Sequence, residues 1–169
     1  SEILARNDRV IINTPRLHGS IALTGGLVDD LTLIDYREEL DKDSAEIVLL
    51  SPQSSNDAYY AQFGWVGAQG LKVPDEKTKW ATNSSTLGPD SPVTLLWDNG
   101  AGLIFKRSFA LDENYMFTVT QTVENNSKSA VALNSYGLIS RRGTPETTGF
   151  YILHEGLIGV FEKTLSEID

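Results

Sequence analysis

Apolar residues recur at every second position in this sequence, and turn-forming residues separate the alternating stretches. In residues 9–40, Val10 and Ile12 fall on one face of a strand that Pro15 ends, and Gly25-Gly26 provides a backbone suited to a tight turn. The strand between these turns places four residues on one face: Leu17, Gly19, Ile21 and Leu23. A period of two is typical of half-buried strands and is not the period of a helix.

The same alternation continues through most of the chain. The clearest hairpin is predicted around Asp98-Asn99-Gly100, because Asn-Gly tolerates positive φ at both turn positions. Strands are also predicted at residues 46–50, 59–66, 93–98, 103–111, 115–123, 131–139, 150–153 and 157–161. Residues 67–92 are expected to form a long excursion over the sheet with a short strand at 80–82, and residues 162–168 are the one place where a helical turn is expected.

Closely spaced strands with tight turns and no interleaved helices predict an all-β fold, an antiparallel β-sandwich. The length of 169 residues is enough for one such domain, so we expect residues 1–169 to form a single unit. No apolar run approaches the roughly 20 residues of a membrane helix, and no signal peptide is visible. We therefore expect a soluble piece of a longer protein.

Charge and composition exclude several kinds of function. The net charge is −9, from 23 acidic and 14 basic residues, which argues against a nucleic-acid partner and against adsorption to anionic lipid headgroups. The absence of cysteine excludes thiol catalysis, cysteine zinc sites and iron–sulfur clusters. We expect no cofactor and no metal.

The two histidines, His18 and His154, are the first candidates for chemistry. With a carboxylate such as Glu155 they would be suited to metal binding or acid–base work, but they lie far apart without ligand spacing. A surface or structural role is more typical. Asp29-Asp30 would point to opposite faces of a strand, so we expect two solvated carboxylates beside a turn.

Aromatic residues form the second candidate group. A platform for sugars is one interpretation, but aromatic residues at alternating strand positions are more often part of a core. The group consists of Tyr59, Tyr60, Phe63, Trp65, Trp80 and Trp97. No catalytic residue is predicted.

Four blocks carry a family resemblance. They are residues 14–40, residues 59–80 (YYAQFGWVGAQGLKVPDEKTKW), residues 97–125 (WDNGAGLIFKRSFALDENYMFTVTQTVEN) and residues 136–162 (YGLISRRGTPETTGFYILHEGLIGVFE). In this order they resemble the N-terminal portion of the large periplasmic domain of the YidC membrane protein insertase family of Gram-negative bacteria. The likeness runs over most of the chain.

The resemblance implies a β-supersandwich like that of galactose mutarotases, truncated in this chain, on the periplasmic side of the inner membrane. It implies a non-catalytic domain that assists insertion and folding of inner-membrane proteins, with the accessory subunit of the Sec translocon and client membrane proteins as partners. It also implies a cleft that has been proposed to hold extended substrate or a small ligand. No mutarotase catalytic residue has a match in this chain.

Truncation would leave sheet edges or apolar faces open, so pairing with another copy or with missing polypeptide is expected. The competing hypothesis is a carbohydrate-binding or mutarotase-like sugar-processing sandwich, which needs a histidine and a carboxylate in a deep pocket. For the insertase hypothesis, residues 141–158 are the surface to test first, although Tyr151, Leu153 and Leu157 are also suited to a core.

Overall fold

The protein was analysed as a computed structural model that describes residues 4–6, 8–144 and 156–168. In these residues the regular structure consists of strands and one short 3-10 helix, η1 (Leu4–Arg6). The expectation of an all-β fold is confirmed. No helix in the described part of the chain is long and apolar enough to cross a membrane.

The larger sheet has seven strands in the order β11-β5-β3-β2-β1-β7, with β4 paired to β3 outside this path. Its members are β1 (Arg9–Asn13), β2 (Leu17–Ala22), β3 (Val28–Arg37), β4 (Glu46–Leu50), β5 (Tyr59–Gly67), β7 (Thr86–Leu87) and β11 (Leu133–Arg141). All pairs are antiparallel except β1 with β7, so the sheet is mixed and the expectation of a purely antiparallel fold is wrong at this edge. The parallel pair forms because the segment that follows β5 brings Thr86 and Leu87 alongside β1.

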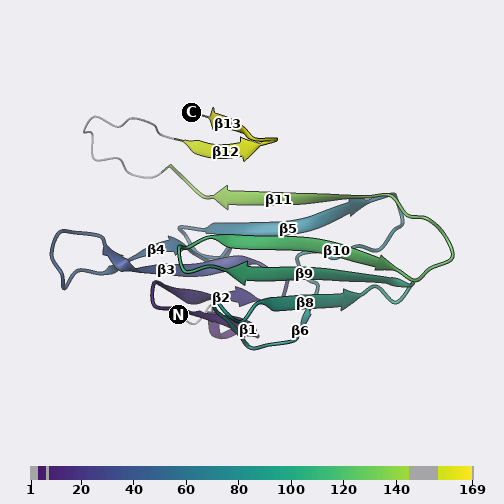
Figure 1. Ribbon diagram of the computed structural model, residues 1–169, viewed down its shortest axis with the longest axis horizontal. Coiled ribbons are helices and arrows are strands. Elements are labelled where there is room, and N and C mark those ends of the chain that lie inside the picture. The colour runs from purple at the N-terminus through teal and green to yellow at the C-terminus, as the bar shows by residue number, and fades with distance from the viewer. Residues whose placement is uncertain (1–3, 7, 145–155, 169) are drawn as a thin grey trace.

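The second sheet has four antiparallel strands in the order β10-β9-β8-β6. They are β6 (Ala81–Thr82), β8 (Val93–Asp98), β9 (Leu103–Leu111) and β10 (Phe117–Asn125). This sheet lies over the larger one, with β10 at the same side of the molecule as β5 and β11 (Figure 1). Ring contacts between Phe63 and Phe109 and between Trp65 and Phe105 join the two layers.

The predicted hairpin between β8 and β9 is present, but its turn differs from the expectation. Gly100 and Gly102 have positive φ, whereas Asn99 does not. The buried Asn99 side chain instead accepts hydrogen bonds from the backbone N–H groups of Ala101 and Leu103, at 2.8 and 3.0 Å. The amide therefore closes a longer turn, as Asn side chains do when they bond nearby backbone.

The core lies between the two sheets and consists of the alternating residues that the sequence pattern indicates. Burying these side chains is the main favourable contribution to folding. The fully buried members include Val10, Ile12, Ile21, Leu87, Val93, Leu95, Phe105 and Phe109. The tryptophans Trp65 and Trp80 belong to the same cluster.

A separate hairpin formed by β12 (Leu157–Phe161) and β13 (Thr164–Ile168) follows the described part of the loop after β11. The helical turn expected at residues 162–168 is wrong, because Glu162 and Lys163 adopt positive φ of 51° and 67° and form a two-residue hairpin turn. The strand predicted at residues 150–153 lies outside the described residues.

Candidate functional site

An apolar cleft opens between the two sheets on the side of β5, β11 and β10. Its volume is about 510 Å³, within the roughly 300–1,000 Å³ typical of small-molecule sites. We call it the inter-sheet cleft. Its lining residues are Leu17, Val28, Leu31, Leu33, Leu49, Leu50, Tyr59, Ala61, Phe63, Tyr115, Phe117, Val119 and Ile139.

The cleft exists because β5 and β10 turn their alternating apolar residues toward the same space. On β5, Tyr59, Ala61 and Phe63 share a face, and on β10, Phe117 and Val119 do so. None of the lining side chains is charged. The cleft is therefore suited to hydrocarbon and offers few hydrogen-bonding groups for a sugar.

A second, polar hollow adjoins the inter-sheet cleft. Its volume is about 720 Å³, and it shares Leu49 and Tyr59 with the cleft. We call it the polar hollow; its other lining residues are Glu38, Val48, Ser51, Asn56, Asp57, Arg141, Arg142, Gly143 and Thr144. The guanidinium of Arg141 lies over the Tyr59 ring, 5.1 Å from its centre. The hollow thus places charged groups directly beside an apolar opening.

Tyr115 lines another part of the cleft and has an unusual backbone, with φ at +70°. Its hydroxyl donates a hydrogen bond to Asp35 Oδ2 at 2.8 Å, and Arg16 lies 5.4 Å from its ring centre. Burial, followed by the hydrogen bond to the Asp35 carboxylate, raises the pKa of Tyr115. These contacts hold the β9–β10 turn against the larger sheet.

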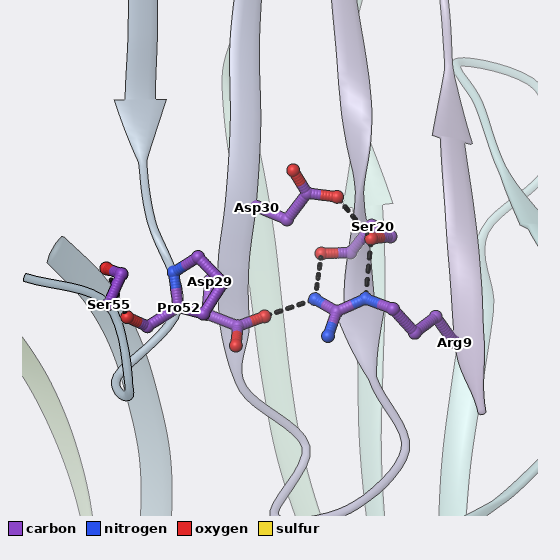
Figure 2. Close-up of polar contacts among 6 residues, drawn as sticks. All are labelled: Arg9, Ser20, Asp29, Asp30, Pro52 and Ser55. Atoms are coloured by element: carbon purple, nitrogen blue, oxygen red, sulfur yellow. Dashed lines mark hydrogen bonds and ion pairs between the residues drawn. The ribbon is translucent and has the colours of Figure 1, made fainter. Parts of the chain in front are cut away.

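A buried polar cluster connects the first three strands (Figure 2). Arg9 Nε donates to Ser20 Oγ at 2.6 Å, and Arg9 Nη2 donates to Asp29 Oδ1. Ser20 Oγ in turn donates to Asp30 Oδ2. Burial of Asp29 raises the pKa of its carboxyl, although the bond to Arg9 opposes the change.

The expectation that Asp29 and Asp30 are solvated and diverge is therefore wrong. Ser20 pairs with Asp30 and Ile21 pairs with Val28, which leaves Asp29 as the extra residue of a β-bulge. A bulge changes the direction of a side chain, so both carboxylates reach one cluster. The charge of Asp29 is matched by Arg9, which makes a structural ion pair the simplest role of the cluster.

The structure places His18 on the surface, 51% exposed, with Nε2 at 3.2 Å from Glu46 Oε2. Glu46 also pairs with Arg37 at 3.1 Å. An imidazole and a carboxylate do meet here, but neither lines the inter-sheet cleft or the polar hollow. His154 and Glu155 lie outside the described residues, and in the described part no three His, Cys, Asp or Glu side chains gather in a way that could hold a metal ion.

The aromatic residues divide between core and cleft. Trp65 and Trp80 are in the core, as expected, while Tyr59 and Phe63 line the inter-sheet cleft. The core interpretation is confirmed for the tryptophans at these two positions. Trp97 is half-buried, packs on Phe105 and has the Lys72 ammonium 5.4 Å from its ring centre.

Sequence reasoning missed Arg107, which is almost fully buried and has its guanidinium over the rings of both Trp65 and Trp80. Its guanidinium donates to the carbonyl oxygens of Gly26, at 2.8 Å, and Phe63. Desolvation by burial lowers the pKa of Arg107 to about 10. The signal was present in the sequence, because position 107 has the same parity as the buried positions 103, 105, 109 and 111 of β9.

Comparison with known proteins gives a consistent result. A family model described as the YidC periplasmic domain matches residues 9–169. Curated relatives named membrane protein insertase YidC are 54% identical over 92% of this chain in Methylobacterium radiotolerans, 53% over 98% in Methylobacterium nodulans and 48% over 94% in Bradyrhizobium diazoefficiens. The chain spans 25%, 28% and 26% of these three relatives, about a quarter of their length.

Proposed function

Because the chain belongs to the YidC periplasmic domain family, we propose that it is a non-catalytic accessory domain of a membrane protein insertase. The domain assists insertion and folding of inner-membrane proteins through surface contacts. Its partners are the accessory subunit of the Sec translocon and client membrane proteins. The family description places the domain in the periplasm, in agreement with the location expected from the sequence.

The observation that carries this proposal is the family match over residues 9–169, which includes nearly all described residues. The site geometry supports it. The inter-sheet cleft is apolar, and His18 with Glu46 lies on the surface away from it. Sugar processing needs converging acid–base groups in a pocket, and the described residues that line the cleft do not supply them.

We further propose that residues 1–169 are one unit and form part of a larger β-supersandwich in the longer protein. The two packed sheets, the open cleft and the edge strand β11 support this proposal. Tyr136, Leu138 and Ile139 on β11 are exposed apolar residues. A sheet edge of this kind is suited to pairing or docking.

The predicted contact surface, residues 141–158, continues directly from β11, but residues 145–155 lie outside the described part. The described surface nearest to it is the outer face of β11, where Tyr136 and Leu138 share a side. We propose that the translocon contact includes this face. Apolar groups on a polar surface are typical of transient protein contacts.

The test is photo-crosslinking in cells with the full-length parent protein. A photoreactive amino acid replaces Leu138, and in a matched control it replaces Leu96, an exposed leucine on β8 of the other sheet. We expect cross-links to the translocon accessory subunit from position 138 and not from position 96. Equal cross-linking from both positions, or none from position 138, would contradict the proposed surface.

Isothermal titration calorimetry with sugars addresses the competing hypothesis. Because the cleft is apolar, we expect no saturable heat. A stoichiometric binding isotherm with a monosaccharide would favour the sugar-binding function instead.

A further inference from the structure

The turn between β8 and β9 contains the one Asn-Gly pair of the sequence, Asn99-Gly100. Asparagine followed by glycine is the pair that deamidates most readily, because glycine has no side chain to hinder a reaction at its backbone nitrogen. The pair lies in the smaller sheet, away from the outer face of β11 that is proposed as a protein contact. Its chemistry is therefore independent of that proposal, and either can fail while the other holds.

Deamidation at such a pair requires no enzyme. The backbone nitrogen of Gly100 attacks Cγ of Asn99, a C–N bond forms, and the side-chain nitrogen takes the proton of Gly100 and leaves as ammonia. The cyclic imide that results adds one water molecule, which opens either of its two carbonyl–nitrogen bonds. The product is aspartate or isoaspartate at position 99, and the charge of the chain becomes more negative by one.

In the folded domain, hydrogen bonds engage both nitrogens of this reaction. The Gly100 N–H donates to Asp98 Oδ1 at 2.8 Å, and Asn99 Nδ2 donates to the backbone carbonyl oxygen of Lys72 at 3.1 Å. Ring closure takes the hydrogen from the first nitrogen and expels the second, so both bonds are lost. The Asp98 carboxylate also opposes deprotonation of Gly100, because a negative charge disfavours another beside it.

The other side of the Asn99 amide is fixed as well. Its Oδ1 accepts the backbone N–H groups of Ala101 and Leu103, and only 5% of the residue is exposed. Movement of Cγ onto the Gly100 nitrogen disturbs these bonds, and burial limits access of the water that opens the ring. The reaction therefore proceeds from molecules in which the turn has opened, as amide hydrogen exchange does.

We infer that Asn99 is a spontaneous deamidation site that folding closes. It reacts in chains whose β8–β9 turn has not formed or has opened, and the products do not rebuild the same turn. A carboxylate places an oxygen, in place of Nδ2, against the carbonyl oxygen of Lys72. Isoaspartate also lengthens the backbone by one carbon within the turn. Because ammonia is lost, the change is not reversed, and it marks copies that remain unfolded for long.

The test compares the intact parent protein in detergent micelles with a synthetic peptide of residues 93–111 at the same neutral pH and temperature. An isolated hairpin is marginally stable in water, and the peptide lacks Lys72. Mass spectrometry after digestion measures aspartate and isoaspartate at position 99 over time. We expect the peptide to deamidate at least roughly a hundredfold faster than the folded parent, since only the opened fraction of the parent reacts.

A matched pair of variants tests the protection by Asp98. Asp98→Ala removes the acceptor of the Gly100 N–H and should speed deamidation of the folded parent roughly tenfold. Asp112→Ala makes the same change in net charge in the β9–β10 turn, where Asp112 Oδ1 accepts the backbone N–H groups of Asn114 and Met116. It should leave the rate at Asn99 unchanged.

A second pair keeps the test decisive if Asp98→Ala does not fold. Asn99→Asp reproduces the aspartate product and should raise amide hydrogen exchange across residues 93–111 of the intact parent roughly tenfold, because the bond to Lys72 is lost. Asn126→Asp makes the same change in net charge at an exposed asparagine after β10 and should leave this exchange unchanged.

Three results would overturn the inference. The first is equal deamidation of Asn99 in the peptide and in the folded parent. The second is deamidation that is no faster in Asp98→Ala than in Asp112→Ala, since the bond to Gly100 would then give no protection. The third is exchange across residues 93–111 that is as slow in Asn99→Asp as in Asn126→Asp, since the product would then rebuild the turn.

Discussion

Replacement of the buried Arg107 tests how the two sheets are held together. Arg107→Met removes the donors to the carbonyl oxygens of Gly26 and Phe63. A buried carbonyl left without a donor costs about 1–3 kcal/mol, so the two together cost about 2–6 kcal/mol. The substitution also ends the burial of a cation. The lowering of the pKa of Arg107 from its ordinary value to about 10 corresponds to roughly 3 kcal/mol at neutral pH.

These two effects nearly offset each other, so we expect Arg107→Met to lower the free energy of unfolding by only about 1 kcal/mol, and by at most about 3 kcal/mol. Arg107→Lys keeps the buried charge but loses the planar fork and its stacking on Trp65 and Trp80, so it should cost more than Met. Arg107→Ala adds a cavity and should cost roughly 2–3 kcal/mol more than Met.

The assay is urea unfolding of the chain and its three variants, monitored by tryptophan fluorescence. The pH dependence provides a second readout. Because the folded pKa of Arg107 is the lower one, the penalty is fully present below about pH 10 and fades as the folded state loses its proton above that pH. Wild type should therefore gain stability relative to Arg107→Met above pH 10. A lysine variant as stable as wild type would refute the reasoning.

Three further predictions concern single side chains. Because burial raises the pKa of Asp29, the stability of wild type relative to Asp29→Asn should fall as pH rises past the ordinary carboxyl range. Urea unfolding midpoints of both proteins at pH 4 and pH 7 check this, and a stability difference independent of pH would contradict it. Gly19→Ala places a Cβ 2.1 Å from the Asp30 carbonyl oxygen of β3 and should cost about 1–3 kcal/mol in thermal or urea unfolding. Gly137→Ala, whose Cβ would lie 3.4 Å from the Phe63 ring, should have little effect; equal losses would be inconsistent with this geometry. Lys163→Gly removes the strain of a positive φ at a non-glycine residue in the β12–β13 turn and should stabilise that hairpin by about 1 kcal/mol. Amide hydrogen exchange in the hairpin should then slow roughly fivefold; an unchanged exchange rate would contradict the turn geometry.

The strands were predictable because their signals are local. Residues 46–50 and 93–98 were predicted with the bounds that β4 and β8 have, since alternation and turn residues flank both. The strand predicted at residues 157–161 matches β12, but β13 and the turn that joins the two strands were missed. That turn consists of Glu162 and Lys163, and neither residue type signals a left-handed backbone.

The sites were less predictable because they depend on residues distant in sequence. Asp29 became buried through a bulge opposite Ser20 and a contact with Arg9 from another strand. A sequence pattern assigns residues to faces, but it does not reveal a one-residue shift in pairing. Arg107 is a partial exception, because its place in the apolar stripe of β9 indicated that it is buried. Its hydrogen-bond partners were not predictable, since they lie on the other sheet.

The family resemblance implied a cleft on the sandwich, but the residue pattern alone could not place the inter-sheet cleft. Its residues read as ordinary core positions, because Leu31, Phe63 and Val119 alternate like their buried neighbours. Whether such faces close on each other depends on how the two sheets are placed and on what covers their edges. The family resemblance, in contrast, was visible in the sequence and is confirmed by the match over residues 9–169.

The most direct measurement is insertion of a client protein by the parent insertase carrying single changes in this domain. Our account holds that the domain works through contact and performs no chemistry, so Leu138→Asp on the exposed face of β11 should slow insertion. His18→Ala and Glu46→Gln, which separate the imidazole from its carboxylate, should leave the rate unchanged. Insertion that depends on His18 and Glu46 but tolerates Leu138→Asp would contradict the account.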